Sequence, residues 1–575
     1  MSDKLVFDLS QEVDGSPNVF VKKDWLNILD NMNGNYNGNQ SVIDTSQLTN
    51  SNKWLSYREG YLYVPMLLSL QAPAGVNGQS FAVAGTSADY AVGLKNWFGQ
   101  IIHSFTLDYN GTTIIQQTPF CNIWNSFKLL TSLSQSDLDT LGPTIGFYPD
   151  NPLTWTYSAA ASPSGYGAAN NTNLLVASPV VADAFNNYKS AGGNNGFLAR
   201  QQFINFTDDA TYGTALVSTI FTEAAASNLW KSHISQKTAT NLQYSISAVI
   251  HLKHLHSFFQ FTPLLKGVYM KMTLNLNNSN SAITITGTAA TPSIPTAMAL
   301  TASSVPSGGV QPAMIASVLA NNGASNLNAT AATGAGVVYL VNLSVGSTCL
   351  NSAITSAGGQ VGKNIYLYIP AYTFNPIFES SYLSSPIKTI KYTDIYQYQV
   401  SNIGANNGSF NQLITNGIAN IKSVLVIPFY AASSNPVGLA GIPVYQSPFD
   451  TAGTGTTSPL CHFTNFNVVI SGQNAIYNTQ RYAFEEWNNQ LYGANAVNGG
   501  QMDGLSSGLI NQLGWEMNYC YYYVNVSRML PVEESVPKSI QIIGTNTSVQ
   551  PLDLMVFVEY GCEISIDALS GARVG

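Results

Sequence analysis

The sequence predicts an all-β protein that contains two copies of one sandwich or barrel domain. Strand-like segments outnumber helical ones, and turn pairs such as Asn110-Gly111 and Asn407-Gly408 separate them. Three residue patterns from the first half of the chain return in the same order in the second half. A chain of 575 residues is also too long for one ordinary core, so two domains are expected.

The three recurring patterns, which we call repeat anchors, predict corresponding positions in the two copies. The first is an alternating strand that ends in proline, and the second is an apolar strand followed by a glycine turn and a later tryptophan. The third is a proline that precedes an apolar run. In the first half the anchor residues are Tyr61, Pro65, Phe105, Gly111, Trp124 and Pro263, and in the second half they are Tyr366, Pro370, Phe466, Gly472, Trp487 and Pro551. The spacing between anchors differs in the two halves, so each copy is expected to lengthen different surface loops.

These anchors divide the chain into four parts. Residues 1–54 have few periodic apolar positions and predict an N-terminal arm or a disordered tail, with one short helix near Trp25–Leu29. Residues 55–281 are predicted to form the first domain and residues 363–575 the second. Residues 282–362 between them are interpreted as an ordered, loop-rich bridge with an insertion, and a flexible linker is the alternative.

Within each predicted domain, periodicity indicates several strands and one helix. A helix is expected over Pro119–Leu141, with a counterpart over Tyr482–Leu491, because apolar residues recur there at helical spacing. The expected strands are Tyr61–Leu70, two within Ile101–Ile115, Ile283–Ile285, Val337–Val345, Ile387–Val400, Ser423–Tyr430, Phe466–Ile470, Ile540–Ile543 and Leu554–Ile566.

Composition limits the classes of function. Only 9% of residues are charged and the net charge is −8, with no basic run, so direct nucleic-acid binding is not expected. The uncharged surface suits packing against copies of itself. The sequence shows no signal peptide and no apolar run long enough to span a bilayer, so synthesis in the cytoplasm is expected. Reduced core thiols are expected for Cys121, Cys349, Cys461, Cys520 and Cys562.

Three segments together resemble the double jelly-roll major capsid proteins of the virophage and polinton-like virus group. They are Phe466–Gly472 with the helix after it, His256–Gly267 with its Pro-Leu-Leu-Lys-Gly ending, and the terminal strand Val556–Tyr560. The resemblance covers about residues 55–575.

The resemblance implies two tandem eight-stranded jelly rolls that stand side by side. It further implies a homotrimer, a pseudo-hexameric capsomer of an icosahedral virion, which contacts neighbouring capsomers, penton proteins and minor capsid proteins. The host cytoplasm is the implied place of synthesis. No enzymatic activity and no cofactor are expected.

The histidine-rich segment contains the weak metal-site candidates His251, His254 and His256. Histidine binds zinc and similar ions, but on a strand His254 and His256 would share one face while His251 points to the other. Because no cysteine or carboxylate lies nearby in sequence, we interpret all three as structural or interface histidines and expect no metal.

Other candidate motifs favour non-catalytic interpretations. The adjacent carboxylates Asp208-Asp209, Glu485-Glu486 and Glu533-Glu534 diverge on a strand or helix, so they do not form a glycosidase pair. The segment Gly504–Gly508 matches the nucleophile-elbow pattern, but a loop precedes it and no histidine follows it. The glycosylation sequon at Asn205 is expected to be a chance match.

Two further classes of function are compatible with the composition of the chain. A carbohydrate-binding adhesin or surface-layer-like β protein is favoured by the Asn/Thr/Gly-rich loops and by aromatic residues that can stack on sugars. A glycoside-active enzyme on a β scaffold ranks last, because no two acids converge.

Overall fold

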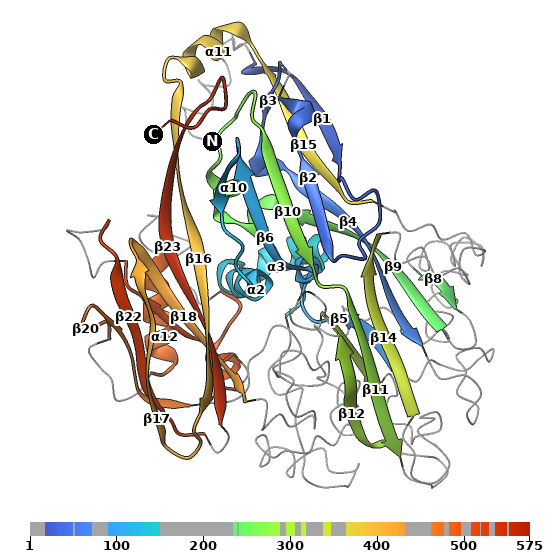
Figure 1. Ribbon diagram of the computed structural model, residues 1–575, viewed down its shortest axis with the longest axis vertical. Coiled ribbons are helices and arrows are strands. Elements are labelled where there is room, and N and C mark those ends of the chain that lie inside the picture. Colours follow the sequence, from blue (N-terminus) through green and yellow to red (C-terminus); the bar gives the residue numbers. More distant parts are fainter. Residues whose placement is uncertain are drawn as a thin grey trace, which may run out of the picture.

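In the computed structural model, the chain forms two β bodies that lie side by side and are joined near one end (Figure 1). The residues that the structure describes are 18–49, 52–71, 90–149, 234–237, 241–287, 295–304, 307, 312–317, 337–346, 364–431, 462–476, 482–495, 508–517, 519–527, 535–548 and 551–574.

The first body is a sandwich of two antiparallel sheets. Its strands are β1 (Phe20–Leu29), β2 (Gln40–Asp44), β4 (Tyr61–Gln71), β6 (Ile102–Tyr109), β7 (Thr112–Ile115), β9 (Asn241–His251), β10 (Met270–Leu276) and β15 (Tyr366–Phe374). One sheet pairs them in the order β1-β15-β4-β9, and the other in the order β2-β10-β6-β7.

The second body repeats this arrangement with strands that are consecutive in the chain. Its strands are β16 (Ile387–Ile403), β17 (Gly408–Ile418), β18 (Ile421–Tyr430), β19 (Phe463–Ile470), β20 (Gln473–Asn474), β21 (Tyr522–Asn525), β22 (Lys538–Asn546) and β23 (Leu552–Asp567). The sheets have the orders β16-β23-β18-β21 and β17-β22-β19-β20.

Both bodies are therefore jelly rolls. When the eight strands of each body are numbered by position along the chain, one sheet has the order one-eight-three-six and the other two-seven-four-five. A jelly roll is this double-sheet arrangement of eight strands. The predicted all-β fold with two tandem jelly rolls is confirmed. Helix α11 (Pro376–Leu383) joins them, and Asn375 caps its N-terminus, because the Asn375 Oδ1 accepts a hydrogen bond from Ile377 N.

Further strands are inserted into the first jelly roll. They are β3 (Trp54–Leu55), β5 (Tyr90–Leu94), β8 (Ile234–Lys237), β11 (Ser279–Gly287), β12 (Pro295–Ser304), β13 (Ala313–Ser317) and β14 (Val337–Val345). β14 pairs with the second half of β4, beyond the point where β15 pairs with its first half, and β11 and β12 extend the sheet from β14. β5 and β13 form a separate two-stranded sheet.

Strand pairing corrects three of the expected boundaries. The segment 1–54 is not only an arm, because β1 and β2 occupy positions one and two of the first jelly roll. The segment 282–362 is not a separate bridge, because β11, β12 and β14 extend the first sheet. The second domain does not begin at residue 363, because β15 closes the first jelly roll, which runs from residue 20 to 374.

The helix expected near Trp25–Leu29 is also wrong, because this segment lies in β1. Leu26 and Ile28 face the sandwich interior, whereas Trp25 and Leu29 are exposed. This alternation has the period of a strand, and pairing with β15 satisfies the backbone of the segment.

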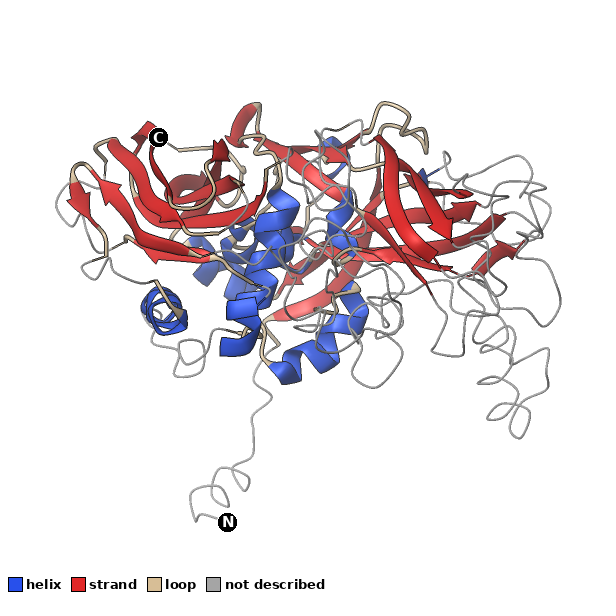
Figure 2. Cartoon of the chain, turned by 90° about the horizontal axis from the view of Figure 1, so that it is seen from below, coloured by secondary structure: helices blue, strands red, loops and turns tan. Residues whose placement is uncertain are grey.

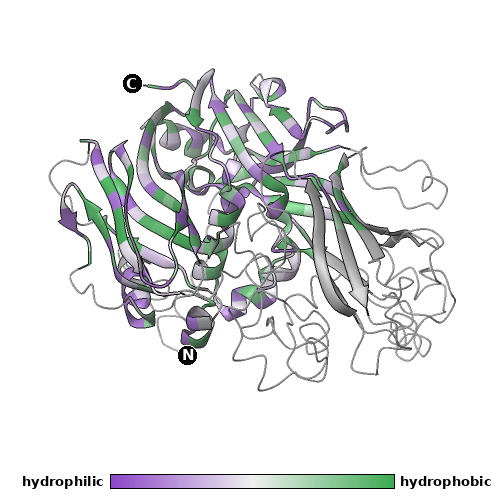
Figure 3. Cartoon of the chain, turned by 60° about the horizontal axis from the view of Figure 1, so that its bottom comes forward, coloured by the Kyte–Doolittle hydropathy of each residue, from purple (hydrophilic) through white to green (hydrophobic). Residues whose placement is uncertain are grey.

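Alternating side chains build the core of each sandwich. In β10 the buried residues are Met270, Met272, Leu274 and Leu276, and the residues between them are partly exposed. Figure 3 shows the same alternation of hydrophobic and hydrophilic residues along the strands of the second jelly roll. Burying one such side chain contributes about 1.5–3 kcal/mol.

Helices are short, and most lie between the two β bodies (Figure 2). The helix predicted over Pro119–Leu141 is present as two helices that break at Leu133-Ser134, where the Ser134 side chain caps the second helix. The helices are α2 (Cys121–Ser132), α3 (Gln135–Ile145), α9 (Leu252–Leu255), α10 (Ser257–Phe261), α12 (Phe484–Asn495) and α13 (Gln512–Met517), and the 3-10 helices are η1 (Ser46–Leu48), η2 (Tyr57–Glu59) and η3 (Phe98–Ile101). No helix among the described residues is both long enough and apolar enough to cross a bilayer.

Candidate functional site between the two jelly rolls

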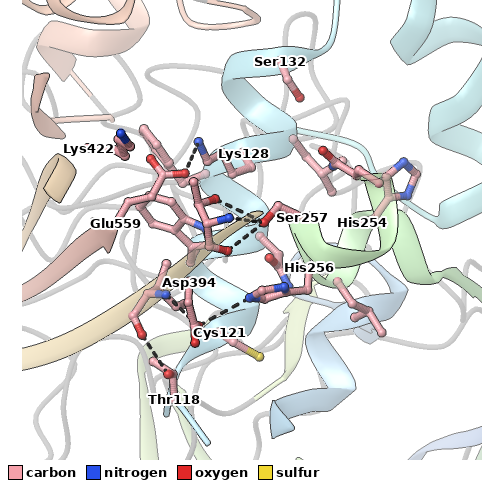
Figure 4. Close-up of a pocket in the computed structure, with 18 of the residues that line it drawn as sticks. Thr118, Cys121, Lys128, Ser132, His254, His256, Ser257, Asp394, Lys422 and Glu559 are labelled. Carbon is pink, nitrogen blue, oxygen red and sulfur yellow. Dashed lines mark hydrogen bonds and ion pairs between the residues drawn. The ribbon is translucent and has the colours of Figure 1, made fainter. Parts of the chain in front are cut away.

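The two jelly rolls meet along a surface that we call the seam, which contains a cavity of about 720 Å³ (Figure 4). The first jelly roll contributes α2, α10 and the chain just after β7, and the second contributes β16, β18, β21 and β23. The seam combines an apolar contact with buried polar pairs.

Helix α10 is fixed to strand β16 by one serine. The Ser257 hydroxyl donates to Thr393 O at 2.7 Å and accepts from Thr393 N at 2.9 Å. One side chain therefore satisfies both the backbone N–H and the backbone C=O of a residue in the other domain. Without Ser257, these two groups of the buried strand would lack a hydrogen-bond partner.

The neighbouring His256 bridges the same two elements. Its Nδ1 accepts from Phe258 N at 3.1 Å and caps α10, so the ring hydrogen lies on Nε2. Nε2 lies 3.4 Å from Asp394 Oδ1 in β16. Asp394 is buried, and it also accepts from Ile395 N at 2.8 Å and from the Tyr560 hydroxyl at 3.3 Å. Burial raises the pKa of Tyr560, which keeps its hydroxyl protonated as a donor.

The arrangement of serine, histidine and aspartate is structural. A serine nucleophile needs its hydroxyl bonded to a ring nitrogen of the histidine. Ser257 Oγ instead bonds Thr393, and His256 Nδ1 is occupied by Phe258 N. The three side chains hold the seam together and do not form a proton relay.

Glu559 on β23 is a second buried carboxylate at the seam. Glu559 Oε1 lies 3.4 Å from Lys128 Nζ in α2, and Glu559 Oε2 accepts from Ser423 Oγ at 2.7 Å. Burial acts to raise the pKa of Glu559, but the Lys128 charge and hydrogen bonds from Ser423 and Thr393 outweigh it, so the pKa is lowered. The carboxylate is therefore ionised at neutral pH and attracts a cation from the other domain.

Hydrogen bonds to backbone carbonyls complete the polar contacts. The Tyr392 hydroxyl donates to Ile114 O at 2.9 Å, and the Thr118 hydroxyl donates to Ile395 O at 2.9 Å. Asn110 Nδ2 donates to Gly571 O at 2.5 Å. These bonds link the β6–β7 hairpin and the chain just after it to the second jelly roll.

Aromatic side chains fill the apolar part of the seam. Phe127 of α2 stacks on Tyr523 of β21, with ring centroids 5.8 Å apart, and Trp124 lies 5.8 Å from Phe557 of β23. Trp487 of α12 contacts Phe127 at 6.0 Å. The outward face of the β16-β23-β18-β21 sheet is thus covered by a helix of the first domain.

The structure brings two of the three candidate metal residues together, because the ring centroids of His251 and His254 lie 5.7 Å apart. His251 ends β9 and contacts Tyr61, His254 lies in α9 against Trp97, and His256 caps α10. Burial, together with smaller contributions from the nearby Lys253 and His251, lowers the pKa of His254 to about 4. Among the residues that the structure describes, no three His, Cys, Asp or Glu side chains gather in the geometry of a metal site.

The repeat anchors fall into two groups. Phe105 and Phe466 lie in the position-four strands β6 and β19, and the glycines Gly111 and Gly472 lie in the following turns with φ of 80° and 84°. Trp124 and Trp487 lie in the helices that follow. These six residues occupy corresponding positions in the two jelly rolls.

The other anchors do not correspond. Tyr61 and Pro65 lie in β4, whereas Tyr366 and Pro370 lie in β15, which is its neighbour in the same sheet. Pro263 precedes β10 at position seven, whereas Pro551 precedes β23 at position eight. The counterpart of β10 is β22, whose residues also alternate between buried and partly exposed.

Several other candidate motifs lie outside the described residues. They are Asp208-Asp209, Glu533-Glu534, the Asn205 sequon and residues 504–507 of the elbow-like motif. Glu485 and Glu486 lie in the first turn of α12, where a negative charge interacts favourably with the helix dipole. Cys121, Cys520 and Cys562 are not joined in disulfides, and Cys349 and Cys461 are not described.

Sequence reasoning missed the residues that build the seam. Periodicity and motif patterns do not identify the residues of the polar contacts, which are Lys128, Ser257, Thr393, Asp394 and Glu559. Three of these residues are charged, and charged residues are rare in this chain. A carboxylate within an otherwise apolar strand, such as Glu559 after the run Leu554–Val558, is the signal that could have indicated a buried ionic contact.

No protein-family model matches this sequence, and no curated protein sequence matches it. Structures from viruses are similar to it at low identity. The 3.5 Å cryo-EM structure of the Sputnik virophage has 12% identity and a TM-score of 0.49, over 97% of this chain and 88% of that chain. The crystal structure of the mavirus major capsid protein has 10% identity and a TM-score of 0.41, over 96% and 89%. A quasi-atomic model of the PBCV-1 virus capsid has 9% identity and a TM-score of 0.37, over 96% and 97%.

At these TM-scores the fold rests on the strand order of this chain itself. Two bodies with the orders one-eight-three-six and two-seven-four-five lie side by side in one polypeptide. The chain is a double jelly-roll protein.

Proposed function

We propose that this chain is a major capsid protein that assembles as a homotrimer and tiles an icosahedral viral shell. The observation that supports this most strongly is the pairing of two jelly rolls of identical strand order along a bonded seam. The similarity of three sequence segments to the double jelly-roll major capsid proteins of virophages and polinton-like viruses agrees with it.

The physical basis is symmetry. Three chains that each carry two similar domains present six similar sides, which gives a pseudo-hexameric outline. Homo-oligomers close by rotation when one side of a subunit binds a different side of the next. A surface with only 9% charged residues repels its copies weakly, which favours such packing.

The proposed partners follow from this role. They are two further copies within the capsomer, neighbouring capsomers, and the penton and minor proteins of the shell. We propose a structural role in the virion without a catalytic step, and synthesis in the host cytoplasm. A net charge of −8 without a basic run supports the absence of direct nucleic-acid binding.

Light scattering coupled to size-exclusion chromatography tests the proposal, together with negative-stain imaging of the same fractions. We expect a mass three times that of the 61.7 kDa chain and particles with a hexagonal outline. A monomer that binds glycans on an array would contradict the proposal and would favour the adhesin alternative.

A further inference from the structure

The outward face of the first jelly roll carries an aromatic cluster that no part of the described chain covers completely. This aromatic face consists of Trp25 on β1, Tyr366 and Tyr368 on β15, and Tyr61 and Tyr63 on β4. In the strand register Tyr368 lies opposite Tyr61, and Tyr366 lies opposite Tyr63. The Tyr61 and Tyr368 rings stack with centroids 5.1 Å apart, and Trp25 lies 5.6 Å from Tyr61.

Strand β1 is the most exposed apolar part of this face. Trp25 is 50% exposed and Val21 is 68% exposed, and Leu29 on the same side of the strand is also exposed. Lys23 lies between them, pairs with Glu59 at 2.7 Å, and lies over the Trp25 ring at 5.4 Å. Large exposed apolar side chains gathered on one face are typical of an interaction surface.

The second jelly roll shows what covers the equivalent face. Its position-one and position-eight strands are β16 and β23, which correspond to β1 and β15. Against these strands lie the β6–β7 hairpin of the first jelly roll and the chain that follows it. Ile114 O accepts from Tyr392, Thr118 donates to Ile395 O, and Trp124 packs on Phe557. The seam therefore joins the hairpin side of one jelly roll to the position-one and position-eight strands of the next.

Each chain carries a second copy of both surfaces. The hairpin of the second jelly roll, β19–β20, has exposed turn residues from Ser471 to Asn474. Figure 1 shows β20 at one side of the molecule and β1 at the opposite side. Within the part of the chain that the structure describes, the β19–β20 hairpin side packs on no second face of this kind, and no second hairpin packs on the aromatic face.

We propose that the aromatic face binds a second copy of this chain through the β19–β20 side of that copy's second jelly roll. This contact repeats the internal seam between molecules, and it rests on the trimer of the proposed function. Because the contact joins two different surfaces, each added copy leaves one surface of each kind free until a ring of three closes. Trp25 and the stacked tyrosines are the residue types that contribute most at such interfaces.

A photo-crosslinking amino acid at position 25 of the full-length chain identifies the occupant directly. After irradiation and proteolysis, mass spectrometry is expected to find residue 25 joined to residues 463–476 of another copy. An equal mixture of isotopically light and heavy protein shows that the link is between molecules. Links to the first jelly roll of another copy, or links only within one copy, would overturn the proposal.

A pair of substitutions measures the energetic contribution. We expect Trp25→Ser to raise the concentration at which trimers dissociate by at least about tenfold, because a half-exposed tryptophan is buried in the contact. The matched control is Leu413→Ser on β17, which is also 50% exposed but lies at the sheet edge away from β20. This control should leave the dissociation concentration unchanged.

The outcomes separate this contact from the proposed function. Trimers of the Trp25→Ser variant that are as stable as wild type, with unchanged circular dichroism, would reject the aromatic face and leave the capsid proposal intact. A wild-type chain that stays monomeric at all concentrations would reject both.

Discussion

Lys128 in helix α2 and Glu559 in strand β23 form an ion pair between the two jelly rolls, with 3.4 Å between Nζ and Oε1. The lysine side chain is 43% exposed, whereas the carboxylate is 10% exposed. The pair is therefore asymmetric: the carboxylate depends on its partner more than the lysine does, because water reaches the lysine.

The first prediction concerns the loss of this cation. We expect Lys128→Met to destabilise the protein by about 1–2 kcal/mol, less than for a fully buried pair because water screens the lysine. The Lys128→Met/Glu559→Gln double variant should recover part of the loss, because no buried charge remains unpaired. Differential scanning calorimetry at pH 7 measures both changes. The control is Lys391→Met, which breaks the exposed pair with Glu563 and should change little. Equal losses for the two lysine variants would contradict this account.

The second prediction concerns acid. The pKa of Glu559 is lower in the folded protein than in the unfolded chain, so its ionisation stabilises the fold above the unfolded value of about 4.3. This contribution is lost as pH falls through the lowered folded pKa. The melting-temperature difference between wild type and Glu559→Gln should therefore shrink at pH values below about 4. A difference that stays constant from pH 7 to pH 3 would show that the charge of Glu559 does not stabilise the seam.

The third prediction concerns His254. Burial lowers its folded pKa to about 4, and the unfolded chain has a value near 6.5. Between these two pH values the unfolded chain binds one more proton at His254 than the folded protein does. The contribution of neutral His254 to the free energy of unfolding is therefore fully present above pH 6.5 and falls as the pH drops toward 4. His254→Gln should make the melting temperature less dependent on pH in this window. Burial also lowers the pKa of His103 to about 4. His103 is unchanged in the His254→Gln variant, so its part of the pH dependence of the melting temperature should remain. An unchanged slope would contradict the prediction.

The fourth prediction concerns the two matching turns. Gly111 and Gly472 have positive φ, and a Cβ at either position would meet nothing within 4 Å, so backbone conformation alone opposes a side chain. We expect Gly111→Ala and Gly472→Ala each to cost about 1–2 kcal/mol. Gly417→Ala is the control, because its site is equally open and its φ is not positive. Thermal unfolding measures the three variants, and equal behaviour of all three would contradict the prediction.

The sequence contained enough information to predict the second anchor and the all-β fold. Phe105 with Gly111, and Phe466 with Gly472, are local patterns in which a strand, its turn and the next helix follow directly along the chain. Local patterns depend on residues that are close in sequence, so periodicity and turn chemistry reveal them.

The strand partners could not be predicted in the same way. Tyr61 and Tyr366 occur in similar segments because both strands face the same solvent side of one sheet, and not because they are copies. Pairing across several hundred residues leaves no periodic signal. The seam bonds between Ser257 and Thr393 and between Lys128 and Glu559 were missed for the same reason.

The closing strand of the first jelly roll, β15, lies at residues 366–374, directly before the linker helix. A ribosome that has synthesised only the first 300 residues has therefore released a sandwich with one central strand missing, with β1 and β4 unpaired along the edges that β15 later fills. The nascent first domain must remain open until about two thirds of the protein has emerged, and a fragment that stops before residue 366 exposes two sheet edges that can aggregate.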